Sequence, residues 1–238
     1  MRQLETVTNL ALDIAFPPAC ANCAEAGKWL CEDCFSLVEI FENQYCPFCV
    51  SPKIVSGGGT CDKCRKTKKL NGLFCATTYK NTIARGLIRR LKYPPALAAC
   101  FAPVLSSFII THFQLLNKKD FASYLWIAVP LHKKKLKRRG FNQAALIAKE
   151  LARRLGGDFA ENMLTKIRST PSQVELNREE REQNIAGAFE CANPEKVKER
   201  DILLVDDVFT TGATLEECAK VLRRAGAKMV WGVVIARE

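Results

Sequence analysis

The sequence lacks the features that mark secreted, membrane-spanning and repetitive proteins. Glu5 and Asp13 interrupt the N-terminal segment and no basic region precedes an apolar run, so we expect no signal peptide. Apolar spacing within residues 1–19 predicts a short amphipathic helix instead. Residues 93–117 carry no formal charge, but their prolines, serines and His112 favour a core helix over a membrane span. We therefore expect a cytoplasmic protein without membrane insertion, and we find no repeat beyond paired cysteines.

Acidic residues are scarce relative to basic ones. The 238 residues include 25 Asp and Glu against 36 Lys and Arg, a net charge of +11. This excess favours an anionic partner, such as nucleic acid, a phosphorylated ligand or an acidic lipid. Hydrophobic residues make up 48% of the chain, which is enough for a core of ordinary size.

Strand and helix patterns alternate along most of the chain. Apolar strands are predicted at residues 73–79, 124–130, 201–207 and 229–236, and helices at 81–91, 142–156 and 214–227. This alternation predicts an α/β domain over residues 71–238, with a mostly parallel sheet flanked by helices. Residues 1–70 hold the N-terminal helix and a cysteine-rich region, so we expect a domain boundary near residue 70.

Eight of the twelve cysteines form four C-x-x-C pairs, separated by 7, 11 and 11 residues. The pairs are Cys20/Cys23, Cys31/Cys34, Cys46/Cys49 and Cys61/Cys64. A C-x-x-C turn presents two thiolates together, and zinc binds four thiolates in a tetrahedron, so the pairs predict two zinc ions. Sequential pairing is the compact arrangement, but the spacing also allows a cross-braced one.

This cysteine-rich region has too few apolar residues to fold around a core of its own. A structural zinc ion contributes roughly 10–16 kcal/mol in isolated fingers, which is enough to order such a segment. Four thiolates leave no coordination position open, so both ions are expected to be structural. Disulfides are disfavoured without an export signal and redox pairs without a βαβ context, while an iron–sulfur cluster remains an alternative.

The segment DILLVDDVFTTGATLEE (201–217) leads a buried strand into two carboxylates and then into a helix. Asp206 and Asp207 come at the carboxyl end of a strand, where parallel sheets bind ligands. The next residues can surround a phosphate with N–H groups and hydroxyls at a helix N-terminus. They are Thr210, Thr211, Gly212, Ala213 and Thr214. Since carboxylates accept hydrogen bonds from sugar hydroxyls, a ribose 5-phosphate would satisfy both halves.

The stretch ILLVDDVFTTGAT resembles the signature with which type I phosphoribosyltransferases bind phosphoribosyl pyrophosphate (PRPP). The resemblance implies that Asp206 and Asp207 hold the ribose hydroxyls and that the loop at 210–214 holds the 5-phosphate. It also implies that Mg²⁺ binds together with PRPP, and that residues 71–238 adopt the type I phosphoribosyltransferase fold.

Three further features resemble the ComF family: residues 129–144 (VPLHKKKLKRRGFNQA), residues 170–189 (TPSQVELNREEREQNIAGAF) and the paired cysteines. That family joins a double zinc ribbon to a phosphoribosyltransferase-like domain and is associated with competence and DNA uptake in bacteria. The resemblance implies a pyrophosphate loop at Leu131 and His132, and a mobile loop at residues 170–189. Its polar positions are Gln173, Arg178, Arg181 and Asn184.

A dense basic run follows the strand at 124–130. Its six members are Lys133, Lys134, Lys135, Lys137, Arg138 and Arg139. Such a run ordinarily predicts a solvated loop, but its position puts it at the ligand edge of the sheet, where it could bind pyrophosphate or a nucleic-acid backbone. Six engaged cations would give a log–log salt slope of roughly −4 with single-stranded DNA. Phe141 is expected to anchor the following helix in the core rather than to stack on a base.

Two other features have plain structural interpretations. A second basic face on the helix at 81–91 is expected to be solvated, and it comprises Arg85, Arg89, Arg90 and Lys92. His132 could carry a proton, but a single histidine in a loop is weak evidence for that role.

The resemblance therefore implies a ComF-like DNA-uptake protein that handles single-stranded DNA and keeps a PRPP-binding pocket. The alternative is an active phosphoribosyltransferase, in which pyrophosphate leaves the ribose through an oxocarbenium-like state and an unidentified acceptor is ribosylated. A third interpretation is a scaffold whose zinc ribbons dock other DNA-uptake proteins. No segment resembles a nucleobase-binding hood, so neither an acceptor nor a catalytic residue is assigned.

Overall fold

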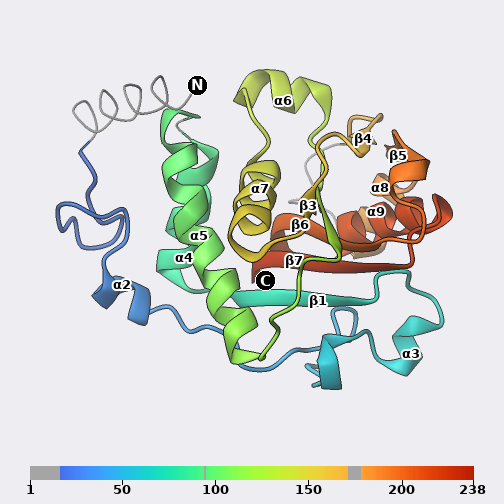
Figure 1. Cartoon of the computed structure of the whole chain (residues 1–238), viewed down its shortest axis with the longest axis horizontal. Helices are drawn as coiled ribbons and strands as arrows, with labels where there is room; N and C mark the ends of the chain where they lie inside the picture. Colours follow the sequence, from blue (N-terminus) through green and yellow to red (C-terminus); the bar gives the residue numbers. More distant parts are fainter. Residues whose placement is uncertain (1–16, 94, 171–177) are drawn as a thin grey trace.

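The computed structural model describes residues 17–93, 95–170 and 178–238. Its centre is a five-stranded parallel sheet in the order β1-β7-β6-β2-β3 (Figure 1). The strands are β1 (Gly72–Thr78), β2 (Tyr124–Ala128), β3 (Asp158–Phe159), β6 (Asp201–Phe209) and β7 (Met229–Arg237). The predicted α/β class is confirmed. The helix expected within residues 1–19 lies almost wholly outside the described residues.

Helices α4 (Thr82–Lys92), α5 (Pro95–Leu115) and α7 (Gln143–Leu155) cover one face of the sheet. Their ends follow the predicted capping residues. The Asn81 side chain accepts a hydrogen bond from the Ala84 N–H at 3.0 Å and so starts α4. Gly156, with a φ of 89°, ends α7. Phe141 is half-buried against this core, which agrees with the anchoring role expected for it.

Helix α5 has the length and composition of a membrane span over Leu97–Leu115, but 50% of that window is buried within the protein. Phe101 and Phe108 pack on Trp29 and Phe35 of the cysteine-rich region, with ring centroids 5.3 and 5.2 Å apart. The same two residues also belong to the core beneath the sheet. Helix α5 is therefore a core helix, as the sequence predicted, and the structure shows in addition that it holds two parts of the chain together.

Helices α9 (Ala213–Arg224) and α8 (Arg178–Ile185) pack on the opposite face, together with an antiparallel pair, β4 (Leu164–Lys166) and β5 (Phe189–Cys191). A short 3₁₀ turn, η3 (Pro194–Lys196), leads into β6. The loop expected at residues 170–189 is thus helical over its second half. Gln173 and its neighbours at 171–177 lie outside the described residues.

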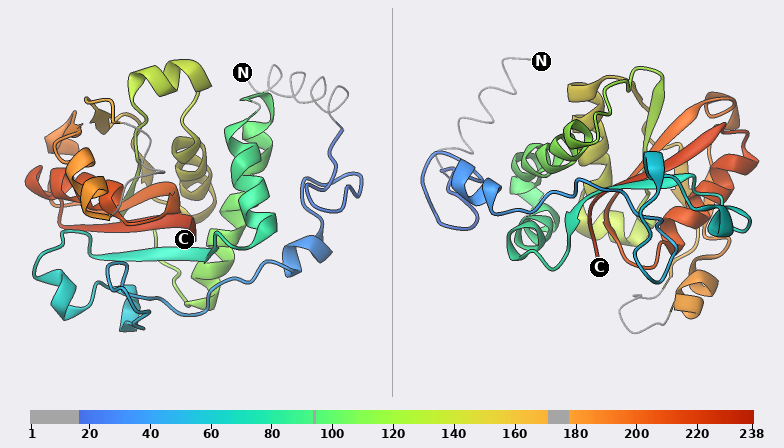
Figure 2. Two further views of the ribbon diagram at one scale, coloured as in Figure 1. Left: turned by 180° about the vertical axis from the view of Figure 1, so that it is seen from behind. Right: turned by 90° about the horizontal axis from the view of Figure 1, so that it is seen from below.

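The cysteine-rich region contains α2 (Glu32–Ser36), η1 (Ser56–Gly58) and α3 (Asp62–Arg65). Its first half lies beside α5 and its second half lies beside β1, at separate places on the sheet domain (Figures 1 and 2). The second half is joined to β1 by backbone contacts. The Thr60 N–H donates to the Asn71 carbonyl at 2.6 Å, and Gly59 forms an antiparallel bridge with Gly72. The boundary predicted near residue 70 therefore falls within a hydrogen-bonded segment.

Candidate functional site

A cavity of about 820 Å³ opens where β2 and β6 end, which is within the size range of small-molecule sites. Carboxylates, basic side chains and the turn between β6 and α9 line it together. From the predicted set it gathers Asp206, Asp207, Leu131, His132, Lys134, Lys135, Arg138, Thr210, Gly212, Ala213 and Thr214. Thr211, Lys133, Lys137 and Arg139 are not among its lining residues. The cavity therefore joins most of the predicted phosphate and sugar contacts to part of the basic run.

Both aspartates lie in the last part of β6, beyond the end of β2. Ala128 is the last residue of β2 in register with β6, opposite Val205, so the sheet opens just before the carboxylates. Successive side chains of a strand point to opposite faces. Asp207 therefore points to the side of Val205, toward α4 and α7, and Asp206 to the opposite side, toward α9.

Asp207 is buried and held by two side chains of the protein. Lys92 Nζ forms an ion pair with Asp207 Oδ2, and Gln143 Nε2 donates to Oδ1 at 3.3 Å. Burial alone would raise the pKa of Asp207, but the charge of Lys92 and the hydrogen bonds outweigh it and hold the pKa below its usual value. Lys92 therefore has a structural role, and its expected place on a solvated basic face is wrong.

Asp206 is half-buried and its carboxylate accepts the Asp207 backbone N–H at 2.8 Å. Burial, followed by the negative charge of Asp207, raises the pKa of Asp206 well above its usual value. Its ionised form is thus poorly stabilised by the protein alone. A hydroxyl donor or a cation that enters the cavity can supply the missing stabilisation.

The turn after β6 is built around Gly212. This residue has a φ of 81° and precedes the first residue of α9, so the N-terminus of α9 lies at the cavity. A methyl group on Gly212 would come within 2.4 Å of the Phe209 ring, which explains why only glycine fits there. Thr211 Oγ1 accepts the Ala213 N–H at 3.4 Å, so this hydroxyl supports the turn itself.

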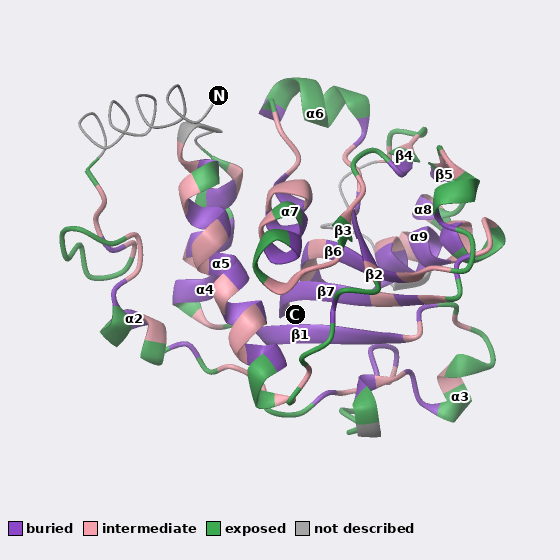
Figure 3. Cartoon of the chain, in the orientation of Figure 1, coloured by how far each residue is buried: buried purple, intermediate pink, exposed green. Residues whose placement is uncertain are grey.

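The basic run forms a helix, α6 (Lys133–Arg139), where the sequence predicted a loop. Lysine, arginine and leucine are good helix formers, and the ends are capped by His132 and by Gly140 with a φ of 83°. Figure 3 shows α6 as an exposed helix at the edge of the molecule. Because of the helical spacing, the cations of α6 lie on different sides of it. Lys134, Lys135 and Arg138 line the cavity, whereas Lys133 and Lys137 are exposed outside it.

Arg139 differs from the other five cations because it points inward. Only 4% of it is exposed, its Nη1 donates to Gln143 Oε1, and its guanidinium lies 5.3 Å from the centroid of the Tyr93 ring. Gln143 in turn donates to Asp207. The structure therefore does not place Arg139 as a contact for DNA or pyrophosphate. It orients the amide that holds Asp207.

His132 is also engaged in the structure of α6. Its Nδ1 accepts the Lys134 N–H at 3.3 Å, as a helix cap does. Burial, then the charges of Lys133 and Lys134, lowers the pKa of His132, which favours the neutral ring that can accept this bond. The geometry thus gives His132 a role in starting α6 at the cavity wall.

Further cavity residues come from segments that the sequence did not single out. Lys166 on β4 reaches the cavity, where its Nζ donates to Thr170 Oγ1 at 2.8 Å. Burial is the main cause of the lowered pKa of Lys166. Ser169 also lines the cavity, as does Gln143 from the segment 129–144. Only the fold brings Lys166 and Ser169 there, and no motif marked these two residues.

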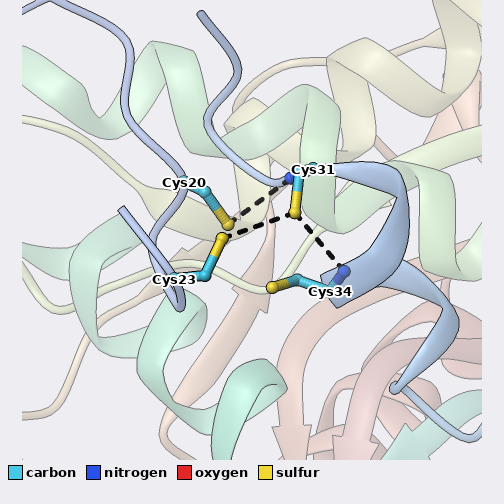
Figure 4. Close-up of side chains that lie close together, drawn as sticks. All are labelled: Cys20, Cys23, Cys31 and Cys34. Carbon is cyan, nitrogen blue, oxygen red and sulfur yellow. Dashed lines mark hydrogen bonds between the residues drawn. The ribbon is translucent and has the colours of Figure 1, made fainter. Parts of the chain in front are cut away.

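The eight paired cysteines form two sets of four. In each set all sulfur atoms lie within 4.8 Å of one another, and the sets are sequential: Cys20, Cys23, Cys31 and Cys34, then Cys46, Cys49, Cys61 and Cys64. Cys23 and Cys31 Sγ are 3.6 Å apart (Figure 4), as are Cys49 and Cys61 Sγ. A zinc tetrahedron with Zn–S bonds of about 2.3 Å has S–S edges of about 3.8 Å, so both sets fit this ion.

Backbone N–H groups complete the surroundings of the sulfurs. The Cys31 N–H points to Cys20 Sγ at 3.5 Å, and the Cys61 N–H points to Cys46 Sγ at 3.5 Å. Asn22 Nδ2 donates to Cys34 Sγ at 3.2 Å. Such donors stabilise thiolates at a metal. We name the two sets ribbon 1 (Cys20 to Cys34) and ribbon 2 (Cys46 to Cys64).

Two family models match the chain. Residues 11–65 match the double zinc ribbon domain, and residues 141–238 match the phosphoribosyl transferase domain. The chain thus joins a double zinc ribbon domain to a phosphoribosyl transferase domain. Together the two matches account for both cysteine sets and for the part of the sheet domain that carries β6 and its turn.

Relatives of the chain are named for competence and for DNA utilization. Competence protein F of Haemophilus influenzae is 39% identical over 113 residues, 46% of this chain and 49% of that protein. DNA utilization protein YhgH of Escherichia coli K12 is 38% identical over 104 residues, 44% of this chain and 45% of that protein. Competence protein ComFC of Streptococcus pneumoniae is 28% identical over 203 residues, 84% of each. The first two matches thus span about half the length of those relatives.

Proposed function

We propose that this ComF-like protein acts in the cytoplasm in DNA uptake, binding PRPP in the cavity and single-stranded DNA on α6. One observation carries the proposal. A single cavity holds a carboxylate that can accept sugar hydroxyls, a helix N-terminus that can bind a phosphate, and five basic side chains. The basic ones are Lys92, Lys134, Lys135, Arg138 and Lys166. The names of the relatives support the role in DNA uptake.

The phosphate, ribose and pyrophosphate groups of the proposed ligand bind in three different parts of the cavity. Its 5-phosphate binds backbone N–H groups of the turn at 210–214 and the hydroxyls of Thr210 and Thr214, and its ribose hydroxyls donate to Asp206. Asp207 lies behind, where Lys92 and Gln143 fix it. The pyrophosphate binds beside Leu131 and His132 among the cavity-lining cations of α6. Its oxygens, with water, satisfy the ligand preference of Mg²⁺.

Single-stranded DNA would bind the outer part of the same helix. Lys133 and Lys137 are exposed there, one turn apart, and do not line the cavity. The basic side chains of α6 are like charges at i, i+4 spacing, which destabilises a helix until an anion neutralises them. Both features suit a phosphate backbone, which supplies anions along its length.

Calorimetry with PRPP and Mg²⁺ tests the sugar site. Asp206→Asn should weaken PRPP binding at least tenfold, because the amide cannot accept both hydroxyl bonds, and should leave single-stranded DNA binding intact. The exposed Asp33→Asn is the matched control and should bind both ligands as wild type does. Equal loss of DNA binding in Asp206→Asn would mean that one site takes both ligands.

The same cavity favours a second candidate, phosphoribosyl transfer. Four cations at the proposed pyrophosphate position, Lys134, Lys135, Arg138 and Lys166, would stabilise the charge that develops as the C1–O bond breaks. The electron pair leaves with pyrophosphate, and the acceptor nucleophile bonds to C1. A pyrophosphate-release assay with PRPP, Mg²⁺ and single-stranded DNA or small acceptors tests this candidate. Release that requires an acceptor and vanishes in Asp206→Asn would support turnover.

Docking of other DNA-uptake proteins to the ribbons remains a prediction.

A further inference from the structure

Ribbon 2 touches the turn that carries the proposed phosphate site. Phe48 lies between two metal-ligand positions, Cys46 and Cys49, and is only 5% exposed. A methyl group on Gly212 would lie 3.2 Å from Phe48 Cε1, so the ring of Phe48 closes the space beside this glycine. A residue held by the metal cluster therefore packs directly on the turn before α9.

The first turn of α9 is also bonded to the segment that leaves ribbon 2. Glu216 Oε1 accepts the Lys69 N–H at 2.8 Å, and Oε2 accepts the Leu70 N–H at 3.0 Å. Only 3% of Glu216 is exposed, so water does not compete for these bonds. Lys69 and Leu70 follow Cys64, the last cysteine of ribbon 2, by a few residues. The carboxylate thus fastens the start of α9 to ribbon 2.

A third contact extends the link to α8. Lys68 Nζ forms a 2.9 Å ion pair with Glu182 on α8 and lies 5.2 Å from the centroid of the Phe48 ring. Glu217 follows Glu216 on α9, and its Oε1 accepts the N–H of Gly187 at 2.8 Å. Gly187 lies just past the end of α8. Ribbon 2, the turn at Gly212 and the segment around α8 are therefore connected on both sides of α9.

Ribbon 1 makes a different set of contacts. Its aromatic residues Trp29 and Phe35 pack on α5, and the Leu37 carbonyl accepts from Asn81 Nδ2 at the start of α4. These helices lie on the face of the sheet opposite to α9. The chain thus contains two similar metal clusters, of which one adjoins the phosphate turn, and ribbon 1 serves as an internal control.

We propose that ribbon 2 positions the phosphate-binding turn, with Phe48 supporting Gly212 and Glu216 fixing the first turn of α9. The shape of a four-thiolate knuckle depends on its metal, so the support depends on an occupied ribbon 2. The inference rests on the proposed phosphate site at residues 210–214 and assigns its preorganisation to ribbon 2.

Matched phenylalanine variants test the positioning role. In Phe48→Ala, backbone amides of residues 212–216 should exchange with deuterium at least tenfold faster, and PRPP binding should weaken at least tenfold. Phe35→Ala removes a ring from ribbon 1 and should leave both quantities within twofold of wild type. Phe48→Leu restores most of the apolar contact and should recover most of the affinity, with two zinc ions retained per chain.

Zinc affinity gives a reciprocal measurement. Since the coupling free energy between two binding sites acts equally on both equilibria, saturating PRPP and Mg²⁺ should raise the affinity of one zinc equivalent in equilibrium competition with a chelator and leave the other unchanged. Cys34→Ser, which breaks ribbon 1, should retain the tightened equivalent. Cys64→Ser, which breaks ribbon 2, should lose it.

The outcomes separate this inference from the proposed function. Wild-type affinity and exchange in Phe48→Ala would overturn the inference, as would an equal loss in Phe35→Ala, which would indicate general destabilisation. If wild type binds no PRPP, the proposed function fails, yet faster exchange at 212–216 confined to Phe48→Ala would still support positioning by ribbon 2.

Discussion

Lys92 at the end of α4 forms an ion pair with Asp207 near the end of β6. The side chains are 26% and 8% exposed, so the pair is only partly reached by water. Gln143 holds the second carboxylate oxygen, and Arg139 holds Gln143. Three elements, α4, α6 and α7, thus meet at one buried carboxylate, and Asp206 beside it is left to face the cavity.

Replacing Lys92 by methionine should therefore destabilise the protein strongly. The substitution keeps the apolar stem but leaves Asp207 charged, buried and without its cation, which typically costs on the order of 3 kcal/mol. Urea unfolding measures the loss. Lys92→Met combined with Asp207→Asn removes both charges and should recover much of it. A double variant as unstable as the single one would show that the loss comes from packing.

The effect of Lys92→Met should also depend on pH in a defined direction. The pKa of Asp207 is lowered in the folded wild type, so its stabilising contribution is present above the unfolded pKa of about 3.9 and is lost as the pH falls through the folded value. In the variant, burial is opposed only by the remaining hydrogen bonds, including that from Gln143, so this pKa rises and acid relieves the buried charge. The difference in unfolding free energy between the two proteins should shrink from pH 7 to pH 4. A constant difference would contradict the ion-pair account.

The sequence predicted the sheet and the residues at the edge where the cavity opens, because both have local signals. Apolar runs bounded by capping residues gave the strands and helices, and Asn81 and Gly156 cap the helices that were expected there. The C-x-x-C spacing gave both cysteine sets. Asp206 and the turn at Gly212 line the cavity because the order strand, turn, helix dictates where they lie.

The roles of individual cations could not be predicted, because they depend on three-dimensional neighbours. Charge density suggested a loop at Lys133–Arg139, whereas capping by His132 and Gly140 makes it a helix. Only the helical period separates cavity, surface and interior positions within it. Lys92 and Lys166 reach the site from α4 and β4, distant in the sequence from the basic run, so no motif could mark them.

Neutralising the two groups of cations on α6 should give different defects. Lys134→Gln, Lys135→Gln and Arg138→Gln together should weaken PRPP binding at least tenfold, since these side chains line the cavity. Lys133→Gln with Lys137→Gln should spare PRPP and flatten the salt dependence of single-stranded DNA binding. With Arg139 buried, five cations remain, and the wild-type log–log slope should be about −3.5 at most.

Lysines at the other edge of the sheet supply the control for α6. Lys196 and Lys228 are exposed and precede β6 and β7, so they lie at the edge opposite to the cavity. Changing both to glutamine removes the same amount of charge as Lys133→Gln combined with Lys137→Gln. An equal flattening of the salt slope would show that overall charge, rather than α6, binds DNA.

Metal analysis should find two zinc ions per chain. Each cysteine set offers four sulfur atoms within 4.8 Å of one another, which satisfies one tetrahedral ion. Cys34→Ser and Cys64→Ser should each reduce the count toward one, because each removes a ligand from a different set. A wild-type count near one would mean that half of the paired cysteines have another role, and iron in the preparation would favour the iron–sulfur alternative.

Two glycines, one in a crowded turn and one with open space around it, test the phosphate turn. Gly212→Ala places a methyl group at a φ of 81° and within 2.4 Å of the Phe209 ring, so it should cost about 2 kcal/mol of unfolding free energy and weaken PRPP binding at least tenfold. Gly86→Ala on α4 meets nothing within 4 Å and has no positive φ, so it should raise stability by up to about 1 kcal/mol and leave binding unchanged. Thermal unfolding and calorimetry on both variants separate strain at the turn from a general response to losing a glycine. Wild-type PRPP affinity in Gly212→Ala would mean that the phosphate does not bind at the start of α9.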